Sequence, residues 1–204
     1  RYPGATTFDG MILWWATTDG PKAVPGTYKV VLSTNGDEQE QTFEIVKDPR
    51  TTASQGDLEA QLDFLLSVRD KLSETNDAII TIRKVREQIN GVMSKTDDAQ
   101  IKELGNAILD DTKVIEEALY QTKNESRQDP LNFPIRLNNK LGHLASLEGV
   151  GDFKPTSQSM AFKDEVSALI DEQLDQLAAI LKARIPEFNK AVYESKVDAV
   201  QLQD

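Results

Sequence analysis

The chain has 204 residues, 34 acidic and 23 basic side chains, a net charge of −11 and no cysteine. The negative charge repels phosphate, so nucleic acid is a poor partner, and without cysteine there can be no disulfide and no thiolate metal site. No apolar run approaches the roughly 18 residues that a membrane span needs, so we expect no membrane insertion. Because the chain starts at Arg1 rather than at a methionine, we expect it to be a piece of a longer protein.

The first 50 residues predict a small β element. Residues 10–15 (GMILWW) are a short apolar run that predicts a buried strand. Residues 28–32 (YKVVL) and 42–46 (TFEIV) alternate between apolar and polar side chains, and the turn signal Asn35-Gly36 lies between them, which predicts a hairpin. Two or three strands alone are marginally stable in water. We therefore interpret residues 1–50 as a hairpin that is a remnant of a larger sandwich, or as an element that leans on the helices.

Residues 51–204 predict a helical domain. A heptad-like apolar stripe covers residues 57–93, and Ser54 with Asp57 forms a capping box at its start. A second long helix is expected over residues 97–123, and a shorter one from Pro134 to residue 149.

The last long helix is expected over residues 157–185, where Pro186 kinks or ends it, with one or two further turns over 188–200. Three long helices and one short helix, joined by short connections, predict an antiparallel up-and-down bundle. The expected fold class is therefore α+β and mainly α.

Residue types that carry chemistry are scarce in this chain. His143 is the single histidine and has no cysteine or second histidine with which to share a metal, so we expect it on a helix surface or between helices. Paired acids such as Asp110-Asp111 are neighbours on a helix and do not face each other, which indicates solvated surfaces. We expect no catalytic residue, no cofactor and no resident metal, with a calcium ion on the acidic surface as a minor alternative.

Three aromatic side chains are the candidate interface or ligand residues: Tyr2, Trp14 and Trp15. Their rings could line a platform for sugars, because aromatic faces stack on sugar rings. The simpler interpretation places one tryptophan in the core and the other at a contact between domains.

The motifs PGTYKVVL (25–32), FEIV (43–46) and DPR (48–50) resemble the last strands of the Ig-like module of flagellar hook-capping proteins. They also resemble the C-terminal region of bacterial exported proteins with sortilin-type or sialidase-like Asp-box (BNR) β-propellers, often labelled glycosyl hydrolases, in which a helical region follows. LNFP (131–134), LNNKL (137–141) and IPEFN (185–189) are similar to that region. The Asp-boxes (Ser-x-Asp-x-Gly-x-x-Trp) are absent from this chain, so no catalytic residue carries over.

This resemblance implies a partial Ig-like β-sandwich or hairpin over residues 1–50, followed by the helical bundle over residues 51–204. Together they would be a non-catalytic accessory region of a propeller-containing protein, located in the periplasm or outside the cell. Its expected partners are the upstream propeller of the same chain, another protein, or a second copy that pairs through the β edge. A carbohydrate-binding module that uses Trp14, Trp15 and Tyr2 is the second hypothesis. A hydrolase that acts through carboxylates is the third.

Overall fold

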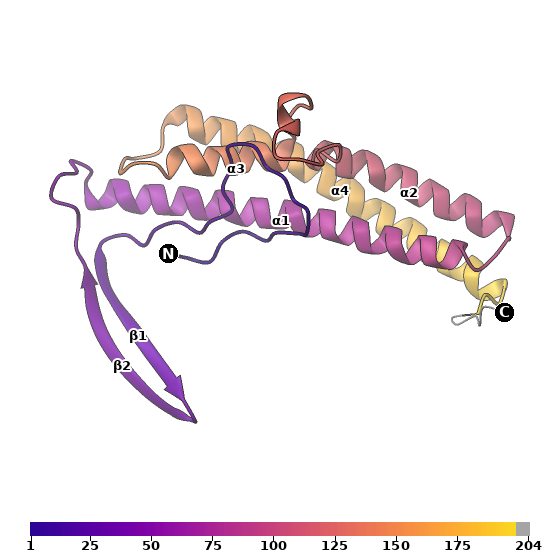
Figure 1. Cartoon of the computed structure of the whole chain (residues 1–204), viewed down its shortest axis with the longest axis horizontal. Helices are drawn as coiled ribbons and strands as arrows, with labels where there is room; N and C mark the ends of the chain where they lie inside the picture. Colours follow the sequence, from indigo (N-terminus) through magenta and orange to yellow (C-terminus); the bar gives the residue numbers. More distant parts are fainter. Residues whose placement is uncertain (199–204) are drawn as a thin grey trace.

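The structure, a computed structural model, describes residues 1–198 and is mainly helical (Figure 1). This part of the chain holds four α-helices and one antiparallel hairpin, which confirms the predicted mainly helical class with a small β element. The hairpin joins β1 (Gly26–Thr34) to β2 (Asp37–Ile45), with Asn35 and Gly36 in its turn. The helices are α1 (Gln55–Met93), α2 (Ala99–Leu119), α3 (Leu137–Glu148) and α4 (Ser157–Glu194).

The helix starts follow local capping rules. The predicted capping box is confirmed, because the Asp57 N–H donates to Ser54 Oγ (3.1 Å) and the Ser54 N–H donates to Asp57 Oδ2 (3.0 Å). The Asp98 side chain caps α2. The predicted end of this helix at residue 123 is wrong, because Tyr120 is extended (φ −137°, ψ 144°) and is held by contacts outside the helix.

The helix α4 continues through Pro186, so the alternative in which this proline ends the helix is wrong. A proline inside a helix removes a backbone hydrogen bond and destabilises the helix. Tertiary packing of residues before and after Pro186 outweighs this cost. The Arg184 guanidinium pairs with Asp111 of α2 at 2.7 Å, and the buried Phe188 and Ala191 pack in an apolar cluster with α1 and α2. The predicted turns over 188–200 are helical to residue 194, and residues 199 and 200 lie outside the described part.

The two longest helices, α1 and α4, run in the same direction, and α2 and α3 follow one another in the opposite direction beside them (Figure 1). Side-chain contacts agree with this arrangement. Ser195 at the end of α4 donates to Asp98 at the start of α2, and Gln61 near the start of α1 donates to the carbonyl of Glu148 at the end of α3. The helix α3 therefore continues the direction of α2 instead of reversing it, which differs from the predicted alternation.

Residues 1–25 form an extended segment that lies on the helices, and we call it the strap. The predicted strand at residues 10–15 is wrong, because the backbone there bonds to side chains of Tyr120, just after α2, and of Asn139 in α3 instead of to a neighbouring strand. The Ile12 N–H donates to the Tyr120 hydroxyl (3.0 Å) and the Trp14 N–H to Asn139 Oδ1 (2.6 Å). The strap adds to the main core, which holds buried side chains of all four helices: Phe64, Val68, Leu72, Ile79, Ile82, Ile115, Leu119, Leu141, Leu144, Val166, Ile170 and Leu177.

The hairpin extends away from the helices near the start of α1 (Figure 1). Within residues 1–198, β1 and β2 are the only strands of their sheet. In the same part of the chain, no helix is both long and apolar enough to cross a bilayer.

Candidate functional site

One face of the hairpin carries most of its apolar side chains, and three of them are exposed. The strand register pairs Tyr28 with Phe43 and Gly26 with Ile45. Because opposed residues share a face and alternate residues along a strand return to it, the apolar side chains gather on one side, with the Tyr28 and Phe43 rings 6.0 Å apart between centroids. We call this side the apolar hairpin face. Its apolar members are Tyr28, Val30, Leu32, Phe43 and Ile45, and Gln39 and Gln41 share the side.

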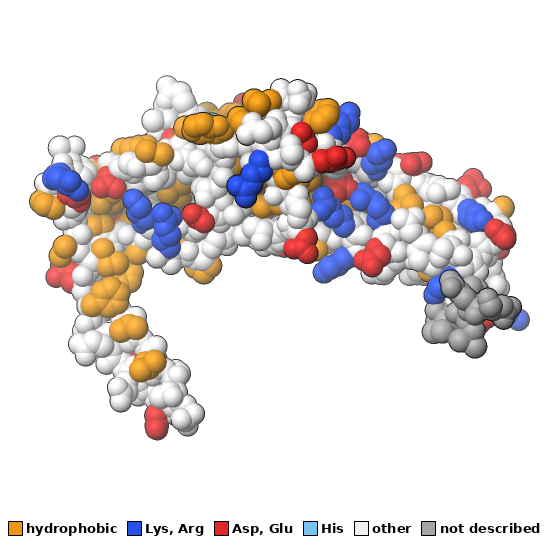
Figure 2. All heavy atoms as spheres, viewed as in Figure 1, with side chains coloured by type: hydrophobic (Ala, Val, Ile, Leu, Met, Phe, Trp, Pro, Cys, Tyr) orange, Lys and Arg blue, Asp and Glu red, His pale blue; other side chains and the backbone are white. Residues whose placement is uncertain are grey.

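The opposite face of the hairpin is polar. It carries the Lys29–Glu40 ion pair (2.8 Å) and the bond from the Ser33 hydroxyl to Glu38 (3.0 Å). Figure 2 shows apolar side chains spaced along the hairpin, with no other part of the chain over them in this view. Val30, which belongs to the apolar hairpin face, is 52% exposed. An exposed apolar row of this kind is typical of an interaction surface.

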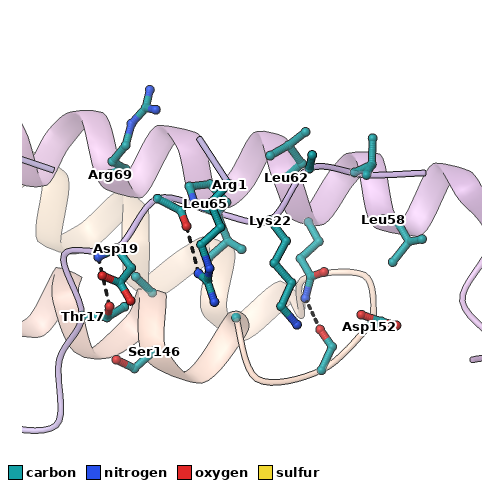
Figure 3. Close-up of a pocket in the computed structure, with 18 of the residues that line it drawn as sticks. Arg1, Thr17, Asp19, Lys22, Leu58, Leu62, Leu65, Arg69, Ser146 and Asp152 are labelled. Carbon is teal, nitrogen blue, oxygen red and sulfur yellow. Dashed lines mark hydrogen bonds between the residues drawn. The ribbon is translucent and has the colours of Figure 1, made fainter. Parts of the chain in front are cut away.

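A cavity of about 510 Å³ lies at the base of the hairpin, between the strap, α1 and α3, and we call it the basal pocket (Figure 3). Its apolar floor is formed by side chains of α1, among them Leu58, Leu62 and Leu65. The strap residues 17–25 and the hairpin residues 45–48 form its walls. The volume lies within the range that ligand pockets occupy in proteins.

The rim of the basal pocket carries both signs of charge. Arg1 and Lys22 contribute cations, and Asp19 and Asp152 contribute carboxylates (Figure 3). The Arg1 guanidinium donates to the carbonyl of Gly20 at 3.0 Å. None of the four side chains forms an ion pair with a residue of the described chain, 1–198. All four charges are therefore open to groups from outside.

The other three charged side chains of the lining already have partners. Arg69 pairs with Asp70, and Lys47 donates to the Ala53 carbonyl at 2.8 Å. Asp48 receives two bonds from the guanidinium of Arg50, at 3.0 and 2.7 Å. The side-chain bonds from Arg50 lower the pKa of the Asp48 carboxyl below its ordinary value, followed by the bond from the Arg50 backbone. Asp48 therefore stays ionised and paired.

Two glycines allow the wall of the basal pocket to form. The two arms of the strap pair through the Tyr2 N–H to the Pro21 carbonyl (2.9 Å) and the Ala5 N–H to the Thr18 carbonyl (2.8 Å). A Cβ on Gly20 would lie 1.8 Å from the Tyr2 carbonyl oxygen. A Cβ on Gly4 would lie 2.5 Å from the Thr18 oxygen. Only glycine fits at these close approaches.

The predicted aromatic residues are all on the strap, but their rings do not form one platform. Trp15 is 74% exposed and has a positive φ of 48°, whereas Tyr2 and Trp14 are half-buried. Among the described residues, ring pairs join Phe8 to Tyr120 and Tyr28 to Phe43, and none joins two of the three candidates. Trp15 alone presents an open ring.

His143 helps to hold the strap, as its Nδ1 lies 3.0 Å from the Trp15 carbonyl oxygen. It is half-buried on α3, which agrees with the expected helix-surface or interhelical position. The acids flagged in the sequence also take part in structure. Asp111 pairs with Arg184. A solvated surface is also expected for the pair Glu116-Glu117, which is wrong for Glu116, because its buried carboxylate pairs with Arg83 and Arg86. Within residues 1–198, no group of such side chains could hold a metal ion.

Neither a family model, nor a curated protein, nor a solved structure matches this chain. The candidate surface is therefore defined by its geometry, as the apolar hairpin face together with the basal pocket. Sequence reasoning found the alternation in the hairpin but missed the pocket. The prolines and glycines of residues 20–26 indicate an irregular, turn-rich backbone there, but they do not indicate which helices would face it.

Proposed function

We propose that this chain is a non-catalytic interaction region that docks on another folded domain through the apolar hairpin face. The apolar row on two paired strands carries this proposal, because its members Val30, Leu32 and Phe43 are exposed. A two-stranded hairpin is marginally stable alone in water, and an apolar partner surface would stabilise it. Burial of each large apolar side chain contributes roughly 1.5–3 kcal/mol.

The resemblance to exported propeller proteins suggests which domain this is. On that basis the partner is the upstream β-propeller of the same protein, and the hairpin belongs to an Ig-like element completed by that region. Another protein is the alternative partner. The same resemblance supports a bacterial periplasmic or extracellular location.

Two neighbouring valines on β1 provide a matched test. Val30 lies on the apolar hairpin face, and Val31, 43% exposed, lies on the polar face. The assay is calorimetric titration of the chain with the separately produced propeller-bearing region. We expect one-to-one binding that Val30→Glu weakens about tenfold or more, because one buried valine is lost and a charge is introduced. Val31→Glu adds the same charge and should bind like the wild type. Absence of binding, or equal loss in both variants, would contradict the proposal.

A carbohydrate-binding role is the second candidate, and the exposed Trp15 ring is the observation that favours it. Titration with oligosaccharides, followed by tryptophan fluorescence, separates the two roles. A saturable shift that Trp15→Ala abolishes would support sugar binding, and an unchanged spectrum would leave the docking role.

A further inference from the structure

The basal pocket is continuous with the apolar hairpin face. Ile45 belongs to both, since it lies opposite Gly26 at the base of the hairpin and also lines the cavity. The next residue, Val46, lines the cavity as well and is 73% exposed. A partner that covers the apolar hairpin face therefore reaches the mouth of the pocket.

The lining of the basal pocket fits a piece of polypeptide better than a single ion. Its floor of Leu58, Leu62 and Leu65 offers apolar contact to a side chain. Its rim offers both cations and carboxylates, which can bond to backbone carbonyls and N–H groups or to polar neighbours of that side chain. A lone anion would meet Asp19 and Asp152, and a lone cation would meet Arg1 and Lys22.

The charge of the hairpin indicates what surrounds such a side chain. Strand β2 carries Asp37, Glu38, Glu40 and Glu44, whereas β1 carries the single cation Lys29. Four negative charges against one positive charge leave the hairpin at −3. Glu38, Glu40 and Glu44 lie on the polar face and Asp37 lies beside the turn, so complementary charge favours a partner whose basic residues surround the edge of the apolar contact.

We infer that the basal pocket is the anchor site of the docking surface, and that it receives one aromatic or long aliphatic side chain from a polypeptide partner whose contact surface has a basic rim. This inference rests on the proposed docking function and names the chemistry of the partner. Anchors of this kind, fully desolvated in a pocket at the centre of an interface, contribute most of the binding energy in many complexes.

The pocket can be tested without the partner by NMR of the leucine methyl groups. The probes are N-acetyl-tryptophanamide and N-acetyl-leucinamide, which carry an anchor side chain on a neutral backbone, with N-acetyl-glycinamide as the matched control. We expect saturable shifts of the Leu58, Leu62 and Leu65 methyl signals at millimolar concentrations of the first two probes only. The absence of shifts, or equal shifts with the glycine probe, would overturn the inference.

A second experiment fills the pocket with a larger side chain. Ala145 of α3 lines the cavity, so Ala145→Phe should abolish the probe-induced shifts. If Ala145→Phe does not fold, Ser146→Leu in the same wall takes its place. Ala178→Phe, at an exposed position of α4, is the control and should keep them. If the filled variant still gives the shifts, the probes bind elsewhere and the inference is wrong.

The same variants separate this inference from the docking function. In the titration with the propeller-bearing region, Ala145→Phe should weaken binding at least tenfold and Ala178→Phe should not. If Val30→Glu weakens binding and Ala145→Phe does not, the docking function holds and the anchor site is overturned. If neither variant changes binding, both are overturned.

Discussion

Side chains from the helices satisfy the backbone of the strap at several points. The Asn139 amide both accepts from the Trp14 N–H (2.6 Å) and donates to the Trp14 carbonyl (2.9 Å), as a neighbouring strand would. Asn76 donates to the Thr6 carbonyl at 2.7 Å. These asparagines are buried in the helices and hold an extended segment that contributes apolar side chains to the core.

Removal of the Asn139 amide should detach the middle of the strap. Asn139→Ala leaves the N–H and the carbonyl of Trp14 without partners, so we expect a loss of about 1–3 kcal/mol in the free energy of unfolding. Urea denaturation measures it, and Asn189→Ala at an exposed position of α4 is the control, expected within about 0.5 kcal/mol of wild type. Equal effects of the two variants would show that the strap is not held in this way.

Asp98 should make stability depend on pH. Its carboxylate accepts from the Ser195 hydroxyl (2.7 Å) and from the N–H groups of Ile101 and Gln100, and the Ser195 bond is the largest cause of the lowered pKa. Because the pKa is lower in the folded state, the carboxylate stabilises the fold above the unfolded pKa of about 3.9. That contribution is lost as the pH falls through the folded pKa.

The variant Asp98→Asn tests this sign. It should be less stable than the wild type at pH 7, and the difference should shrink as the pH falls below about 4. Urea denaturation at pH 7, 4 and 3 measures both proteins. A difference that stays constant over this range would contradict the role of the charge.

Elements set by neighbouring residues could be predicted from the sequence, whereas the strap could not. The capping box at Ser54 and the turn at Asn35-Gly36 depend on residues close in sequence, and both form as expected. The strap depends on partners 108 and 125 residues away, Tyr120 and Asn139, which no local pattern links to it. In the apolar run at residues 10–15, Met11 and Leu13 pack against the core, but no residue of the run is fully buried and Trp15 is 74% exposed. The expected buried strand is therefore wrong in its burial as well as in its partner.

Two helical glycines differ in what surrounds them, because Gly142 lies against the strap and Gly91 faces open space. A Cβ on Gly142 of α3 would lie 2.9 Å from the Ala16 Cβ of the strap and 3.4 Å from the Thr17 oxygen, whereas a Cβ on Gly91 of α1 would meet nothing within 4 Å. The Thr17 N–H donates to the Gly142 carbonyl at 3.1 Å, which keeps the two segments close.

Alanine at these two positions should therefore change stability in opposite directions. Gly91→Ala should stabilise the protein by roughly 0.5–1 kcal/mol, because glycine is a poor helix former. Gly142→Ala should destabilise it by about 1–3 kcal/mol through overpacking against the strap. Thermal denaturation of both variants measures the signs. Stabilisation by both would mean that the strap does not lie against α3.

The whole molecule is an elongated helical body with the hairpin at one end (Figure 1). Within the described chain neither strand has a second neighbour, and the free edge of β1 carries a single charge, Lys29. Such an edge can pair with a second copy. We expect weak dimers at high concentration, strengthened by salt because each chain has a net charge of −11. Sedimentation equilibrium tests this, and a monomer at every concentration and salt level would contradict it.

The central claim is that the hairpin is a docking element whose apolar face is open in the free chain. Amide hydrogen exchange of residues 26–46 tests it most directly, measured in the chain alone and with the upstream propeller-bearing region that we propose as its partner. We predict fast exchange in the free chain and strong slowing in the complex, with the buried core of α1 slow in both states. A complex that forms while the hairpin exchanges at its free rate would contradict the claim.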